Sequence, residues 1–258
     1  MEILISVIVF IYGLVFGSFF NVVGYRLPNN LSIMNPRGSF CPKCHHELRW
    51  YELIPVLSFI IQKGRCRECK DKIALFYPII ELSTGILFLL SYLTFGITTE
   101  FVIAILISSY LIIVVVSDGK YMIIPDEVTL FFSISILVVE LLSYGPKDTL
   151  VYLASGLALF GIVFVFMKIT SKLFKKDSLG GGDIKLEFFS GAALGITNGL
   201  FSIFVASIFA LPVSLYNLNK NKSNMIAFGP FLLLGVLIIY LFKIDIVKII
   251  KDLTYVYW

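Results

Sequence analysis

The stretch Phe101-Val-Ile-Ala-Ile-Leu-Ile-Ser-Ser-Tyr-Leu-Ile-Ile-Val-Val-Val-Ser117 carries no charged residue and ends directly at Asp118. A helix needs about 20 largely apolar residues to cross a hydrocarbon core of about 30 Å. The whole chain shares this character, because 58% of its 258 residues are hydrophobic, 15% are charged and its mean hydropathy is +0.93. Soluble domains are less apolar and more highly charged. The sequence therefore predicts an all-α polytopic membrane protein.

Eight apolar stretches are candidates for transmembrane helices. The sixth is short and contains Lys185 and Glu187, and only the helix-breaking cluster Thr197-Asn198-Gly199 separates it from the seventh. The first has no basic residue before it and no cleavage pattern after it, so we expect a retained anchor. Internal repeats are not apparent. The expected spans are Ile3 to Gly24, Tyr77 to Phe95, Phe101 to Ser117, Val128 to Ser143, Leu150 to Leu173, Ile184 to Ile196, Leu200 to Tyr216 and Ile226 to Phe242.

One polar insertion, Tyr25 to Phe76, separates the first span from the others, which divides the chain into residues 1–24, 25–76 and 77–258. Short loops rich in Lys and Arg stay in the cytoplasm, so we expect a cytosolic insertion and an outer amino terminus. The exception is the Lys243 to Trp258 tail, for which we expect an amphipathic helix at the interface. The insertion holds nine of the 21 basic residues: Arg26, Arg37, Lys43, Arg49, Lys63, Arg65, Arg67, Lys70 and Lys72. Further lysines on the expected inner side are Lys120, Lys172, Lys175, Lys176, Lys220 and Lys222.

The net charge of +4 follows from this inward bias and indicates no nucleic-acid partner, which would need a clustered basic groove with stacking aromatics. We expect the 24 Phe and 13 Tyr to face lipid and its interfaces. The partner that composition indicates is the lipid bilayer.

All four cysteines fall in the insertion, as Cys41-Pro42-Lys43-Cys44 and Cys66-Arg67-Glu68-Cys69, with 21 residues between the pairs. Two such knuckles can close one tetrahedral thiolate site around zinc. A reducing cytosol disfavours disulfides. We therefore expect a structural zinc that supplies folding energy to the insertion. His45 and His46 adjoin the first knuckle, where we interpret them as a solvated pair.

Two carboxylates, Asp118 and Asp183, are placed by this topology at the same, cytosolic membrane face. Carboxyl groups within a few ångströms of each other share a proton, so such a pair holds one acid and one base at the same pH. Peptide hydrolysis by an activated water needs that combination. The residues therefore favour an intramembrane aspartic protease. The alternative is that each is structural, with Asp183 as an N-cap and Asp118 as a wet helix end.

Neighbouring residues have both supporting and structural interpretations. Gly180, Gly181 and Gly182 permit unusual backbone conformations and close approach of a substrate, and they set Asp183 at a helix start. Asp126 is the alternative to Asp118 as a catalytic carboxylate. Its position after a proline favours instead a role as the N-cap of the next helix, with Glu127 in the first turn of that helix. We expect Glu81 in the first turn of the second span. Lys185 and Glu187 face the interior or water, where either can orient substrate.

The chain closely resembles the bacterial prepilin peptidases, the bifunctional type IV prepilin leader peptidase and N-methyltransferase family of GxGD aspartic proteases. Successive motifs carry the resemblance in family order. They are Gly17-Ser18-Phe19-Phe20-Asn21-Val22, Tyr25-Arg26-Leu27-Pro28, the two cysteine knuckles, Glu52-Leu53-Ile54-Pro55-Val56-Leu57-Ser58, Tyr77-Pro78 through Glu81, Asp118 with Ile124-Pro125-Asp126, Gly180 to Asp183 with Lys185, and Phe228-Gly229-Pro230-Phe231.

The resemblance implies that Asp118 and Asp183 are the catalytic pair, with Asp126 accompanying them. It implies prepilin or pseudopilin substrates whose short basic leader is removed at the cytosolic face of the bacterial inner membrane. S-adenosylmethionine-dependent methylation of the new amino terminus, with the insertion as its seat, is implied by resemblance alone. The residues also leave open a presenilin-like protease, for which the four cysteines have no use, and a non-enzymatic transporter or scaffold that uses the aspartates for ions.

Overall fold

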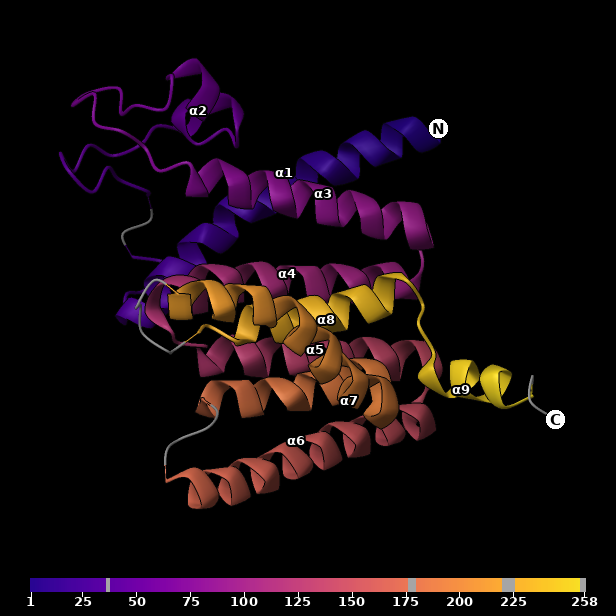
Figure 1. Cartoon of the computed structure of the whole chain (residues 1–258). Coiled ribbons are helices and arrows are strands. Elements are labelled where there is room, and N and C mark those ends of the chain that lie inside the picture. Colours follow the sequence, from indigo (N-terminus) through magenta and orange to yellow (C-terminus); the bar gives the residue numbers. More distant parts are fainter. Residues whose placement is uncertain (36–37, 176–179, 220–225, 256–258) are drawn as a thin grey trace.

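The computed structural model describes residues 1–35, 38–175, 180–219 and 226–255, and its regular elements there are helices (Figure 1). Arg37, Lys176, Lys220, Lys222 and the end of the expected tail, residues 256–258, lie outside the described residues. The longer helices are α1 (Glu2–Arg26), α2 (Leu57–Ile61), α3 (Phe76–Phe95), α4 (Thr99–Tyr121), α5 (Asp126–Tyr144), α6 (Pro146–Phe174), α7 (Gly181–Asn219), α8 (Gly229–Leu241) and α9 (Ile246–Tyr255).

Within the described residues, six helices are long and apolar enough to cross a membrane: α1, α3, α4, α5, α6 and α7. Helix α8 is equally apolar but shorter, with 13 residues. Each of the eight expected stretches contains a helix: the sixth and seventh form the two halves of α7, and the eighth is helical from Gly229 to Leu241. The expected all-α polytopic fold with a four-cysteine insertion between the first two spans is confirmed.

The break within α7 lies at Gly195, not at the expected cluster Thr197-Asn198-Gly199, which is helical. Gly195 has φ 75° and ψ 172°, a conformation that is open to glycine because it has no Cβ. Asn198 makes a tertiary contact instead, since its Oδ1 accepts the N–H of Ile246 at the start of α9. The prediction placed the break too late because an Asn-Gly pair does not interrupt a helix when its side chain has another partner.

Helix α4 is the central helix, and it packs against α1, α3, α5 and α8. Its span is the most buried of the six. Tyr110, in its middle, is fully buried and donates its hydroxyl to Thr129 of α5 at 2.7 Å. Its ring stacks on Phe132 and meets the edge of Phe189 from α7. These contacts fix α5 and α7 relative to α4.

Helices α1 and α3 cross at a stripe of small residues. A Cβ on Gly13 would lie 2.7 Å from the Cα of Gly85, and one on Gly17 would lie 2.8 Å from the Cα of Glu81. Two glycines four residues apart let helix backbones approach this closely in membranes. The pair therefore sets the position of α3, and with it the end of the insertion.

The two ends of the helix bundle differ (Figure 1). The insertion with α2 and the start of α7 lie at the left end of the view, whereas α9 lies at the right. Helix α9 is strongly amphipathic, as expected for the tail. The start of α7 and the end of α4 thus lie at the end of the bundle that carries the insertion.

Candidate active site

Asp118 lies in the last turn of α4, which runs on to Tyr121 instead of ending at Ser117. Its side chain is buried, with 6% of the residue exposed. The N–H of Gly229, the first residue of α8, donates to its Oδ2 at 3.2 Å. A helix N-terminus favours negative charge. Helices α4 and α8 therefore hold this carboxyl group together.

Asp183 lies in the first turn of α7, at the same end of the bundle, and it is partly buried. The surroundings of the two carboxyl groups share one side chain, that of Ile124. The side chain of Ile124 packs against Gly182, which precedes Asp183, and against Gly229, whose N–H binds Asp118. A Cβ on Gly182 would lie 3.0 Å from Ile124, and a Cβ on Gly229 would lie 2.7 Å from it. Segments far apart in the sequence thus bring both aspartates to one site.

The three glycines before Asp183 act through space and not through unusual backbone angles. None of them has a positive φ, contrary to our expectation. A Cβ on Gly180 would lie 3.2 Å from Asp183 Oδ2, and one on Gly182 would press on Ile124. Gly181 has nothing within 4 Å. Close packing therefore requires glycine at positions 180 and 182 but not at position 181.

Asp126 is not the N-cap that we expected. The N-cap of α5 is Pro125, and Asp126 is its first helical residue, with Glu127 beside it in the first turn as predicted. Its carboxylate pairs with Lys185 of α7, with the Nζ 2.7 Å from both oxygens. The pair is exposed at the site's edge, so its contribution to stability is below about 1 kcal/mol. It links the start of α5 to the start of α7.

Glu81 is also placed differently from the prediction, since the first turn of α3 holds no acidic residue. The carboxyl group is buried, and its Oε2 accepts the N–H of Val56 at 2.8 Å. Val56 has φ 62°, an unfavourable conformation for a β-branched residue. Glu81 therefore holds a strained turn of the insertion against the membrane helices.

A cavity of about 230 Å³ adjoins Asp183 between α6, α7 and α8. Its polar side chains are Asp183 and Glu187, which lie one helical turn apart on α7. The other lining residues are apolar: Ile162, Val163, Phe166, Leu200, Ile203, Phe228 and Leu232. An apolar side chain next to a reacting group fits such a space.

The four cysteines of the insertion converge as expected. Their sulfur atoms all lie within 4.8 Å of one another, and the Cys41–Cys69 and Cys44–Cys66 pairs are 3.9 Å apart. A tetrahedral site with zinc–sulfur bonds of about 2.3 Å needs sulfur atoms about 3.8 Å apart. The donor set therefore fits zinc, which would be fully coordinated by these four sulfurs.

The two knuckles form a structural repeat that the sequence did not reveal. Antiparallel bridges Phe40–Glu47 and Arg65–Lys72 close the two loops, and each is displaced by 25 residues from the other. Equivalent hydrogen bonds run from the N–H of Cys41 to His46 and from that of Cys66 to Asp71. Residues 39–48 and 64–73 share little besides their cysteines, which is why inspection of the sequence missed the repeat.

The thiols of the cluster differ in acidity. Backbone N–H groups of Cys44 and Lys43 lower the pKa of Cys41 to about 7. At Cys69 the backbone N–H of Asp71 lowers the pKa of the thiol. Burial and the three other thiols raise it by more, so that the pKa of Cys69 is about 11. Four thiols this close cannot all ionise without a cation between them, so this arrangement favours a divalent metal.

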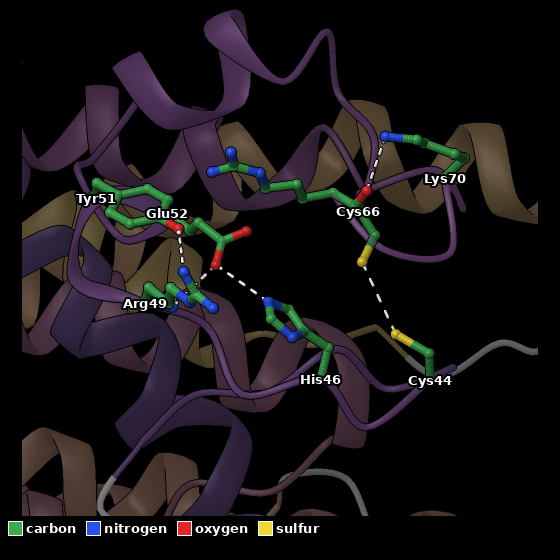
Figure 2. A network of polar contacts seen from close by, with 8 residues as sticks. Cys44, His46, Arg49, Tyr51, Glu52, Cys66 and Lys70 are labelled. Atoms are coloured by element: carbon green, nitrogen blue, oxygen red, sulfur yellow. Dashed lines mark hydrogen bonds and ion pairs between the residues drawn. The ribbon is translucent and has the colours of Figure 1, made fainter.

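His46 is not a solvated residue, whereas His45 is exposed as expected. Figure 2 shows His46 directed at Glu52, with the Arg49 guanidinium group at Tyr51, beside the facing sulfur atoms of Cys44 and Cys66. His46 Nε2 lies 3.1 Å from Glu52 Oε2, which also accepts the N–H of Arg49. Burial would raise the pKa of Glu52, but these two contacts outweigh it and hold the pKa below its ordinary value. The network braces the first knuckle.

Glu140 was overlooked in the sequence because it lies near the end of an apolar span, in α5. It is 2% exposed, and its Oε2 has no hydrogen-bond partner within the described ranges. A second cavity, of about 630 Å³, opens at the opposite end of the bundle from Asp118, and Glu100, Tyr144 and Lys243 are among its lining residues. The aspartates are absent from that lining.

The fold and the site define a polytopic membrane protein with a four-cysteine insertion, in which two carboxyl groups lie at helix ends on the same side of the bundle as that insertion. Residues 11–95 match the family model described as the bacterial peptidase A24 N-terminal domain, and residues 105–215 match the type IV leader peptidase family. The chain belongs to this prepilin leader peptidase family, as the resemblance predicted.

Curated relatives agree over most of the chain. It is 35% identical to the prepilin leader peptidase/N-methyltransferase of Bacillus subtilis (strain 168), over 93% of this chain and 96% of the relative. The protein of the same name from Vibrio cholerae is 34% identical over 81% of this chain and 85% of the relative. The one from Neisseria gonorrhoeae is 30% identical over 89% of this chain and 88% of the relative. No solved structure gives a significant match.

Proposed function

We propose that this protein removes the leader from type IV prepilins or related pseudopilins by aspartate-catalysed hydrolysis. The observation that carries the proposal is that Asp118, at the end of α4, and Asp183, at the start of α7, lie at the same end of the bundle, where Asp183 lines an apolar cavity. The side chain of Ile124 packs against Gly182, next to Asp183, and against Gly229, whose N–H binds Asp118. The names of the relatives supply the substrate class.

In the proposed reaction the two carboxyl groups share one proton. The ionised group takes a proton from the attacking water while its protonated partner donates to the carbonyl oxygen of the scissile bond. The roles then reverse, and a proton passes to the leaving amine. No covalent intermediate forms, which agrees with the location of both histidines, His45 and His46, in the insertion and not beside the aspartates.

We further propose that the site faces the cytosol at the bacterial inner membrane. Support comes from the basic residues of the insertion, which lies at the same end of the bundle as the start of α7 (Figure 1). A basic leader is then recognised on the side on which it is synthesised, near the acidic Asp126 and Glu127. In this arrangement Lys185 and the glycines Gly180 and Gly182 support Asp183, whereas Gly181 has open space beside it.

The second activity in the relatives' names, N-methylation, is proposed for the insertion. Zinc held by Cys41, Cys44, Cys66 and Cys69 would keep the knuckles folded, with all its positions filled by sulfur. S-adenosylmethionine would supply the methyl group for the amine that cleavage exposes. The His46–Glu52 contact and the Glu81–Val56 contact support the insertion from its two sides.

Mass spectrometry of a purified prepilin incubated with the protein and S-adenosylmethionine tests both activities at once. We expect the mass of the mature pilin plus one methyl group at its amino terminus. An intact prepilin would reject the peptidase assignment, and a cleaved but unmethylated product would reject the transferase assignment. Cleavage within a transmembrane helix would favour the presenilin-like alternative.

A further inference from the structure

Glu187 is a buried carboxyl group that the reaction above does not use. It is 2% exposed, and neither of its oxygens has a hydrogen-bond partner among the described residues. The nearest lysine in the sequence, Lys185, is already paired with Asp126. A polar group buried without a partner costs free energy, and a charged one costs more. Such a group is expected to acquire its partner from a bound molecule.

The cavity defines what that molecule brings. Glu187 lines the cavity together with Asp183, one turn away, and the remaining walls are apolar side chains of α6, α7 and α8. A ligand that satisfies this lining has an apolar group for the walls and a hydrogen-bond donor for the carboxyl group. Both must fit within a few ångströms of the carboxyl group of Asp183.

A peptide being cut has the complementary need. Its backbone must be extended around the scissile bond so that the carbonyl is accessible, which leaves main-chain N–H groups without partners of their own. Away from water each unpaired N–H costs several kcal/mol, so such groups need an acceptor from the protein. The unpaired acceptor of the cavity and the unpaired donors of the substrate would satisfy one another.

We propose that Glu187 binds substrate by accepting a hydrogen bond from a main-chain N–H next to the scissile bond, while the cavity takes the adjoining apolar side chain. This inference rests on the proposed function, because it requires cleavage beside Asp183. Recognition through the main chain is independent of the side chain's identity, so Glu187 selects an extended backbone and the cavity walls select apolarity.

A double-substitution cycle tests it. The probe is a synthetic peptide that spans a prepilin cleavage site, with single amide-to-ester replacements on either side of the scissile bond, which stays intact. For the unmodified protein, one ester peptide should show a KM raised about tenfold, the loss expected when a hydrogen bond to a buried carboxyl group is removed. With Glu187→Leu, the amide peptide should show the same rise, and the ester should add less than about twofold.

Two variants separate binding from packing. Glu187→Gln keeps an acceptor oxygen and should restore most of the affinity. Glu140→Leu removes another buried carboxyl group with an oxygen that has no partner among the described residues, near the end of α5 that lies away from Asp118, and should leave KM unchanged. Glu187→Leu should melt in detergent at the same temperature or higher, since it removes an unpaired buried carboxyl group.

An unchanged KM in Glu187→Leu, or an ester effect that persists fully in that variant, overturns the inference alone. If the unmodified protein fails to cut the amide peptide, or Asp183→Asn still cuts it, the proposed function falls and this inference with it.

Discussion

At the scale of single residues, the packing around Ile124 sets where Asp118 and Asp183 lie. Its side chain fills the space between Gly182, next to Asp183, and Gly229, whose N–H binds Asp118. Both glycines are therefore needed for their lack of a side chain. The sequence motifs located both aspartates, but the role of Ile124 depends on a tertiary contact that no local pattern encodes.

Gly182→Ala should lower the rate of prepilin cleavage by about tenfold, because its Cβ would lie 3.0 Å from Ile124 and displace the start of α7. Gly181→Ala is the matched control, since nothing lies within 4 Å of the added carbon, and it should cleave at the normal rate. Equal rates in the two variants would contradict this role for Ile124.

Glu52→Gln should destabilise the insertion by about 1–2 kcal/mol at neutral pH, because it removes the negative charge that strengthens the two hydrogen bonds accepted by one buried oxygen. The pKa of Glu52 lies below its ordinary value of 4.5 in the folded protein. Its contribution is therefore complete above the unfolded pKa and disappears as the pH falls through the folded pKa.

Hydrogen exchange of the insertion's amides, measured for both proteins across pH 3.5 to 7, should show a difference that shrinks at acid pH. A difference that grew towards acid pH would contradict the assignment of Glu52 as an ionised acceptor. Since both proteins are compared at each pH, acid effects on the cysteine cluster cancel to first order.

At the scale of elements, chain length and apolarity predicted which segments are helices, but not where α7 bends. The bend depends on a single φ of 75° at Gly195. The Asn-Gly pair that begins three residues later is the stronger sequence signal for a helix break, yet the helix continues through it. In the same way, the spacing of four cysteines predicted the metal cluster, whereas the repeat of two knuckles became apparent only from matching hydrogen bonds.

Gly195→Ala should destabilise the protein by about 1–3 kcal/mol, because alanine in that conformation is strained. Thermal unfolding in detergent should show a lower midpoint. Gly161→Ala in α6 is the matched control, since its added carbon meets nothing within 4 Å and its φ is not positive, and it should unfold at the same temperature or slightly higher.

Cys66→Ser should abolish bound zinc, because three thiolates leave the tetrahedral site incomplete. Elemental analysis should find one zinc per unmodified chain and almost none in the variant, with faster proteolysis between η1 (Leu27–Asn29) and α3. His46→Ala should keep its zinc, since His46 bonds to Glu52 and not to the cluster. A zinc-free unmodified protein would contradict the structural-metal assignment.

At the scale of the whole molecule, the bundle is an arrangement that carries two distant helix ends to one place. The central α4 ends at the site, α7 begins there, and α5 and α8 begin beside them with the Asp126–Lys185 pair and the Gly229 N–H. The sequence predicted a common membrane face for the two aspartates from the distribution of basic residues. Their convergence follows from helix packing, which periodicity alone does not specify.

The most direct measurement of the central claim is the cleavage rate of a purified prepilin by Asp118→Asn, Asp183→Asn and Asp126→Asn in detergent, each checked for normal expression and melting temperature. The first two should lose at least about a thousandfold in rate, since each removes one member of an acid–base pair. Asp126→Asn breaks an exposed ion pair and should stay within about tenfold of the unmodified protein. Near-normal cleavage by either Asp118→Asn or Asp183→Asn would contradict the claim that these two carboxyl groups act together.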